Sequence, residues 1–141
     1  MSYQYPSATE NNNGLFGPTN NNHYYTSVHY HKRNATHKKG KTRWAIPSNG
    51  EYHVFKTADE NQWLCNNNNA LFSVIDMGNE VLGENEERLG YFRVPVNTSD
   101  PWHGFPVMSS NYAPSSDLLD FWEKKGIIPY HFRLKIELRK V

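Results

Sequence analysis

Cysteine occurs once in the 141 residues, at Cys65, so no disulfide can form within the chain. This excludes the small secreted domains that disulfides hold together. We expect Cys65 to be a buried thiol in a strand rather than a nucleophile, because a nucleophilic cysteine needs a histidine partner in space. No apolar run approaches the roughly 18 residues of a membrane span, and the first residues have no signal-peptide core. The sequence therefore predicts a cytoplasmic protein that does not use a membrane.

Phosphate-binding loops and metal-ligand sets are also absent from the sequence. It contains neither Gly-x-x-x-x-Gly-Lys nor Gly-x-Gly-x-x-Gly, the patterns that cradle nucleotide phosphates. His29 and His31 would share a face of an extended segment, but a zinc site needs about three or four ligands and nothing nearby completes the set. We predict neither a cofactor nor a metal site.

Apolar residues are scarce, at 37% of the chain, and the mean hydropathy is −0.82. The deficit lies mostly in residues 1–40, where asparagine runs flank short aromatic patches and no helical or strand period persists. Such a segment has too little apolar surface to offset the entropy of ordering. The sequence thus predicts a disordered, Asn-rich arm over residues 1–40, followed by a single domain over residues 41–141.

Charge is divided unevenly along the chain, although the net charge is only +1. Six basic residues and no acidic ones lie between residues 11 and 50, namely Lys32, Arg33, Lys38, Lys39, Lys41 and Arg43. The remainder, residues 51–141, holds nine Lys or Arg and thirteen Asp or Glu. A basic arm with interleaved tyrosines, attached to a mildly acidic domain, is typical of attachment to single-stranded nucleic acid or to an acidic protein. A tail that only keeps the protein soluble is an equally good interpretation.

Patterns within residues 41–141 predict an α+β domain. Short β-prone runs predict a mostly antiparallel sheet of five to seven strands, at residues 43–46, 51–57, 63–65, 70–76, 80–82, 88–96 and 132–139. The last run alternates apolar and charged residues, as a half-buried strand does. One helix is predicted on one face of the sheet, starting at a hydroxyl cap in residues 114–116 and ending before Gly126.

The most specialised stretch is the aromatic loop at residues 97–112. Pro95, Pro101 and Pro106 predict an irregular path, because proline cannot donate to a strand ladder. Ordering a loop of this kind costs conformational entropy, which must be offset by packing against the domain or by binding a partner. Trp102, His103 and Phe105 are therefore our candidate binding residues in the loop, together with Arg93 before it and, in the basic arm, Lys32, Arg33, Lys38, Lys39 and Arg43.

Two functions from different classes fit these residues. The first is a non-catalytic binding module that contacts nucleic acid or a protein partner through the basic arm and the loop at residues 97–112. The second is a small metal-independent nuclease or toxin-like hydrolase. In that enzyme His103 acts as general base, Asp100 or another carboxylate orients it, and Arg93 or Arg133 stabilises phosphate charge. The sequence leaves open whether the chain is an enzyme.

Overall fold

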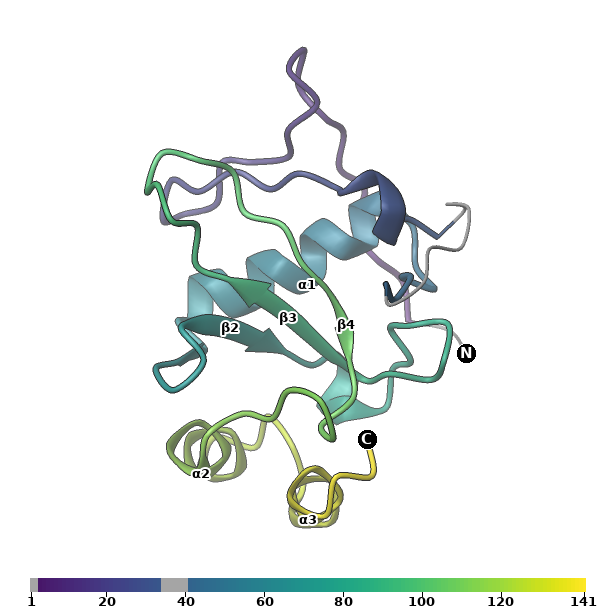
Figure 1. The fold of residues 1–141 in the computed structure, drawn as a ribbon, viewed down its shortest axis with the longest axis vertical. Helices are drawn as coiled ribbons and strands as arrows, with labels where there is room; N and C mark the ends of the chain where they lie inside the picture. The colour runs from purple at the N-terminus through teal and green to yellow at the C-terminus, as the bar shows by residue number, and fades with distance from the viewer. Residues whose placement is uncertain (1–2, 34–40) are drawn as a thin grey trace.

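The computed structural model describes residues 3–33 and 41–141 and has an α+β fold built on one antiparallel sheet (Figure 1). The sheet has four strands, adjacent in chain order: β1 (Leu64–Cys65), β2 (Ala70–Ser73), β3 (Leu89–Arg93) and β4 (Phe105–Val107). The helices are α1 (Ser48–Asn61), α2 (Ser116–Lys124) and α3 (Tyr130–Glu137). Single 3-10 turns occur at η1 (His29–His31) and η2 (Asp76–Gly78).

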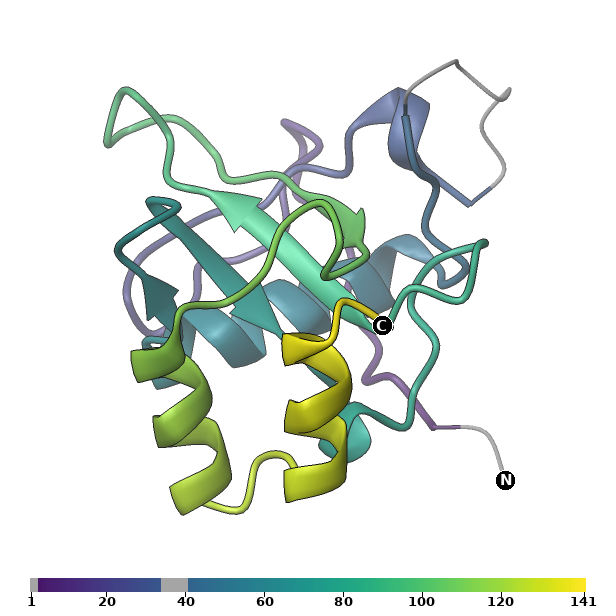
Figure 2. The ribbon, with the colours of Figure 1, turned by 60° about the horizontal axis from the view of Figure 1, so that its bottom comes forward.

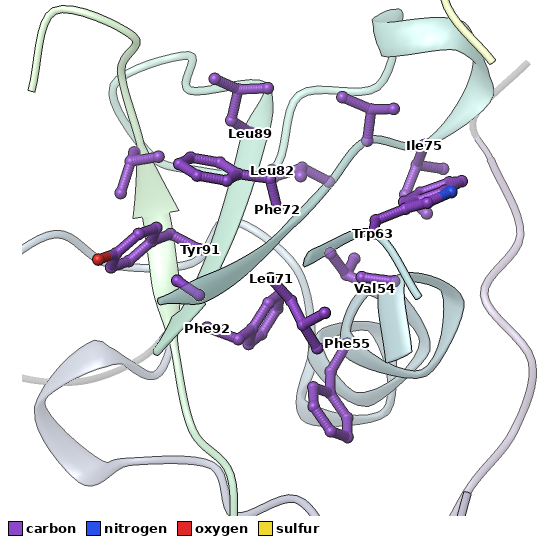
Figure 3. Packing of buried hydrophobic residues seen from close by; sticks show 14 of the residues in the cluster. Val54, Phe55, Trp63, Leu71, Phe72, Ile75, Leu82, Leu89, Tyr91 and Phe92 are labelled. Carbon is purple, nitrogen blue, oxygen red and sulfur yellow. The ribbon is translucent and has the colours of Figure 1, made fainter. Parts of the chain in front are cut away.

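The sheet lies between two helical layers. Helix α1 runs along one face, and α2 and α3 lie side by side beyond the other face (Figures 1 and 2). Alternation along the strands explains this, because successive side chains point to opposite faces. Phe92 of β3 packs on Phe55 of α1 with ring centroids 5.5 Å apart, whereas its neighbour Tyr91 stacks on Tyr112 at 4.5 Å. Figure 3 shows Leu71 and Phe92 on the α1 side and Phe72, Tyr91 and Leu89 on the other.

Three strands lie where the sequence predicts them, at β1, β2 and β3. The predicted strands at residues 43–46 and 80–82 are wrong: residues 80–82 pair in no strand, and Trp44 forms only an isolated bridge with Gly83. The fourth strand, β4, lies inside the segment that we predicted to be irregular, with Pro106 opposite Gly90. Proline is tolerated there because β4 is an edge strand, so its missing N–H removes no interior ladder bond.

Helix α1 replaces the strand predicted at residues 51–57, so that prediction is wrong. The segment is rich in β-prone residues, but its buried positions recur at helical spacing: Glu51, Val54, Phe55, Ala58 and Asp59. The helix ends where Gln62 takes a left-handed conformation with φ 58°. Burial of a continuous helical stripe against β2 and β3 outweighs the local strand preference of these residues.

The last predicted strand is also wrong, since residues 130–137 form α3. Phe132 and Ile136 are buried, while Leu134 and Leu138 are exposed. The two buried residues are four apart, a spacing that fits a helix face as well as an alternating strand.

By contrast, α2 confirms its prediction: the amide of Leu118 donates to the Ser115 hydroxyl cap, and Leu118, Leu119 and Trp122 are buried. The predictions of a single helix and of five to seven strands therefore both fail.

The prediction of a disordered arm is supported only in part. Residues 3–33 have little regular structure beyond η1, yet Phe16 and Tyr25 are buried and pair with each other through an isolated bridge. Tyr25 has no exposed surface, and its ring packs on Phe55 at 5.3 Å. This part of the arm thus belongs to the core, while the domain boundary at residue 41 stays a prediction.

Two adjacent tyrosines of the arm test this packing. We expect Tyr25→Ala to lower the free energy of unfolding by about 3–5 kcal/mol, because it removes a large buried ring. Tyr24→Ala is the matched control, since Tyr24 is 36% exposed, and it should change stability by less than about 1 kcal/mol. Urea unfolding followed by tryptophan fluorescence measures both. Equal, small effects of the two substitutions would contradict the packing of the arm.

A buried carboxyl group also joins the arm to α1. Glu51 is 1% exposed, and its Oε1 accepts hydrogen bonds from the Tyr25 hydroxyl at 2.8 Å and from the Ser27 hydroxyl at 3.0 Å. Burial raises the pKa of Glu51 to about 7, against the smaller opposing effect of these hydrogen bonds. The folded protein therefore holds a proton on Glu51 at pH values where the unfolded chain has lost it.

This proton predicts how stability depends on pH. Because the folded pKa lies above the unfolded value near 4.5, the stabilising contribution is complete below pH 4.5 and declines up to about pH 7. The whole decline amounts to about 3 kcal/mol at 1.4 kcal/mol per pH unit. Glu51→Gln should remove it, so the variant gains stability relative to the native protein as pH rises from 5 to 8. The exposed Glu86→Gln is the control. Parallel stability profiles of the native protein and Glu51→Gln would show that Glu51 is ionised in the folded state.

Candidate functional site

A groove runs along the outer edge of β4, where the arm passes close to the sheet. Its volume is about 500 Å³. We call it the β4-edge groove, and its lining residues are His31, Lys41, Thr42, Phe105, Pro106, Val107, Asn111 and Tyr112. The arm, the strand and the segment after the strand all contribute, so the groove exists only when the arm is docked.

The arm is fastened at this edge by backbone and side-chain hydrogen bonds. The amide of Trp44 donates to the carbonyl of His31 at 2.9 Å, and the Thr42 hydroxyl donates to the carbonyl of Pro106 at 2.9 Å. His31 Nδ1 lies 2.5 Å from the carbonyl oxygen of Thr42, so that nitrogen carries the proton and donates. These contacts place the His31 ring against the sheet edge.

Aromatic rings make up much of the surface of the groove. His31 stacks on Phe105 with centroids 4.9 Å apart and planes at 17°, and Tyr112 meets the same phenylalanine edge-on at 6.0 Å. Phe105 and Tyr112 are each half-buried, so neither residue is fully covered by the rest of the protein. Tyr112 is itself held by stacking on Tyr91, which is buried. The arrangement gives fixed, partly open ring faces on which another flat group can stack.

Two cationic side chains lie at this surface. Lys41 is exposed, and its ammonium group lies 5.2 Å from the centre of the Tyr30 ring. Arg93 is exposed at the end of β3, and a hydrogen bond with the Tyr91 side chain raises its pKa. Tyr112, a residue of the groove, also lies close enough to Arg93 to affect the pKa of Arg93 in the same direction. Both cations therefore belong to the same surface as the aromatic rings.

The histidines near the groove are neutral at physiological pH. Burial lowers the pKa of His31, and the nearby charges of Lys41 and His103 lower it further against the hydrogen bond to Thr42. Burial also lowers the pKa of His103. Protonation of these rings therefore requires a pH below the ordinary range of histidine, where it adds positive charge to a surface that is already basic.

The predicted site residues of the loop separate into two places. Phe105 lies in the β4-edge groove, and His103 is exposed and close enough to His31 to influence its charge. Trp102 lies elsewhere: it is 7% exposed, and its ring packs on Phe55 at 5.5 Å. Asp100 lies in an exposed turn, and within the described residues no hydrogen bond or ion pair joins it to His103.

The predicted residues of the arm are likewise divided. Lys32 and Arg33 directly follow His31, with Lys32 half-buried and Arg33 exposed. Arg43 forms an ion pair with Glu84, so its charge is already partly neutralised and attracts another anion less strongly. Lys38 and Lys39 lie outside the described residues. From the sequence, we considered His31 only as a metal ligand and Tyr112 only as part of the loop at residues 97–112, because only the turn of the arm and the β3–β4 pairing bring the two residues together.

Comparisons with protein-family models, with curated proteins and with solved structures give no match for this chain. Over residues 3–33 and 41–141, no three His, Cys, Asp or Glu side chains gather in a group that could hold a metal ion. In the same residues, no helix has the length and apolar character needed to cross a membrane. The function of the chain is therefore inferred from its surface alone.

Proposed function

We propose that this chain is a small non-catalytic module that binds single-stranded nucleic acid in the β4-edge groove. The observation that carries the proposal is the combination of partly open rings, Phe105 and Tyr112, with the exposed cations Lys41 and Arg93. Single-strand binders use cations along the phosphates and aromatic rings under the bases. The basic residues of the arm, Lys32 and Arg33, directly follow His31 of the groove and add electrostatic attraction to phosphates.

The form of the groove favours a single strand over a duplex. Stacking on Phe105 or Tyr112 requires an unpaired base with a free face, which a duplex does not offer. The cations lie beside a strand edge and an irregular segment rather than along one face of a helix that could enter a major groove. Because the rings accept any base, we expect weak sequence preference and strong dependence on salt.

Substitution of the two cations tests the proposal. We expect Lys41→Gln and Arg93→Gln each to weaken binding of fluorescein-labelled oligo-dT and oligo-U at low salt. Each should reduce the slope of log affinity against log salt by about 0.7, the value for one lost phosphate contact on a single strand. Fluorescence anisotropy measures both quantities. Lys124→Gln, an exposed lysine on α2, is the control and should leave them unchanged.

The stacking surface has its own test. Tyr112→Leu keeps an apolar side chain against Tyr91 but removes the ring face, and it should cost about 1–3 kcal/mol of binding free energy. Loss of affinity in the charge variants without any loss in Tyr112→Leu would indicate that the oligonucleotide is held through its phosphates alone, without stacking on the groove. Absence of oligonucleotide binding by the native protein at low salt would overturn the proposal.

The exposed position of His103 near the groove favours a second candidate function, a metal-independent nuclease. In that case the native protein cleaves RNA or DNA in the presence of a chelator. His103→Ala would then retain binding and reduce turnover by roughly a hundred- to ten-thousand-fold. A non-catalytic module instead shows no cleavage, and His103→Ala leaves its affinity within a few-fold of the native value.

A further inference from the structure

A second and larger cavity lies at the C-terminal end of α1, with a volume of about 610 Å³. Its walls come from the arm, the end of α1, the β1–β2 turn and the loop after β3. Polar side chains are supplied by Asn21, His23, Gln62, Asn66 and Thr98, and an aromatic wall by Trp102. Of the candidate residues that the sequence singled out, only Trp102 lines this cavity.

The arm side of the cavity is held by a buried carboxylate. Asp59 is 4% exposed; its Oδ2 accepts from the Thr19 hydroxyl at 2.6 Å, and its Oδ1 lies 2.8 Å from His23 Nδ1. Asn21 adds a hydrogen bond from its Nδ2 to the backbone carbonyl of Asp59 at 2.7 Å. These contacts use the Nδ1 side of the His23 ring and both oxygens of the carboxylate. The side chain of His23 is 35% exposed, and among the described residues no hydrogen bond uses its Nε2.

The charge of the lining limits what the cavity can bind. No lysine or arginine is among the lining residues, and the carboxylate of Asp59 is already occupied by Thr19 and His23. A phosphate or carboxylate would therefore find no lysine or arginine in this cavity. The amides of Gln62 and Asn66 and the hydroxyl of Thr98 instead offer neutral donors and acceptors.

The apolar part of the lining favours a flat ring. Trp102 lies beside the His23 ring at 5.4 Å between centroids, and Leu64, which is 42% exposed, stands at the cavity with Pro95. An exposed leucine beside a tryptophan and a proline is apolar surface that a planar ligand can cover. Amide groups around such a surface are the groups that read the edges of unpaired bases.

We infer that this cavity binds an unpaired nucleobase, with its face on the apolar surface that Leu64, Pro95 and Trp102 provide and its edge toward His23, Gln62, Asn66 and Thr98. The choice of a base over another neutral ring rests on the proposed function, since a strand in the β4-edge groove would supply one. The loop after β3 contributes Trp102 to the cavity and leads directly into Phe105 of the groove. One segment of chain therefore serves both sites.

Free nucleosides test this site without involving the groove, because they carry no phosphate. Adenosine, guanosine, cytidine and uridine are titrated into the full chain, and the tryptophan indole N–H resonances are followed by NMR. We expect at least one nucleoside to shift the Trp102 resonance saturably, with a dissociation constant of about 1 mM or tighter. Trp44, Trp63 and Trp122 do not line the cavity, so their resonances serve as internal controls.

Substitutions of the lining residues distinguish binding in the cavity from non-specific association with the protein surface. Thr98→Val and Asn66→Ala lie on exposed turns, so folding is preserved, and each should weaken the best nucleoside about three- to tenfold. Asn79→Ala, an exposed residue outside the cavity, should have no effect. Methyl glucoside is the control ligand. Equal binding of methyl glucoside, or absence of any saturable Trp102 shift with all four nucleosides, would overturn the inference and leave the His23–Asp59 contact as a fastening of the arm.

The two sites fail in distinguishable ways. Nucleoside binding with no response of oligonucleotide affinity to Lys41→Gln or Arg93→Gln refutes the β4-edge groove and keeps the base site. Oligonucleotide binding that follows the groove variants but gives no Trp102 shift with nucleosides refutes the base site alone.

Discussion

The docking of Tyr25 is the interaction on which the rest of the structure depends. Its ring lies between Phe55 of α1 and Phe92 of β3, at 5.3 Å and 5.9 Å, and its hydroxyl donates to the buried Glu51. Its backbone pairs with Phe16 on one side, and the amide of Thr26 donates to the carbonyl of Trp102 on the other. One residue thus connects the arm, the helix, the sheet and the aromatic loop. Both candidate sites include arm residues on either side of it, His23 and His31, so neither site can form without this contact.

The fold could be predicted from the sequence where local signals and burial agree. The capped helix α2 and the strands β2 and β3 satisfy both, because their apolar residues and boundary residues point to the same element. Helices α1 and α3 could not be predicted in this way. In α1 the residues favour a strand locally, although their buried positions lie at helical spacing. In α3 the buried residues Phe132 and Ile136 are four apart, a spacing that fits both an alternating strand and one face of a helix. Only packing against a partner surface decides such cases.

The candidate sites could be predicted only to the level of segments. Prolines and aromatic residues drew attention to the loop that borders both recesses, but they could not show that Trp102 and Phe105 line different ones. The arm shows the same limit. Its composition predicted disorder, whereas a few large residues such as Phe16 and Tyr25 bury enough surface to fix a long segment with almost no regular structure. Composition describes the mean apolar content of a segment, whereas here the buried surface of two large residues is enough to hold the segment on the domain.

The division of the aromatic loop between two recesses follows from a close approach at Gly104. A Cβ atom at this position would lie 2.2 Å from the carbonyl oxygen of Tyr91 and 2.3 Å from the Phe92 ring, so no other residue fits without moving β3. The Trp44 indole N–H donates to the carbonyl of Gly104 at 3.2 Å and closes the other side. The loop is therefore pinned to the sheet between Trp102 and Phe105, each of which is then free to face its own recess. If a nucleic-acid strand lies in the β4-edge groove while one of its bases lies in the larger cavity, the two recesses must keep a fixed separation. The contacts of Gly104 provide it, because neither Trp102 nor Phe105 can shift without disturbing the sheet.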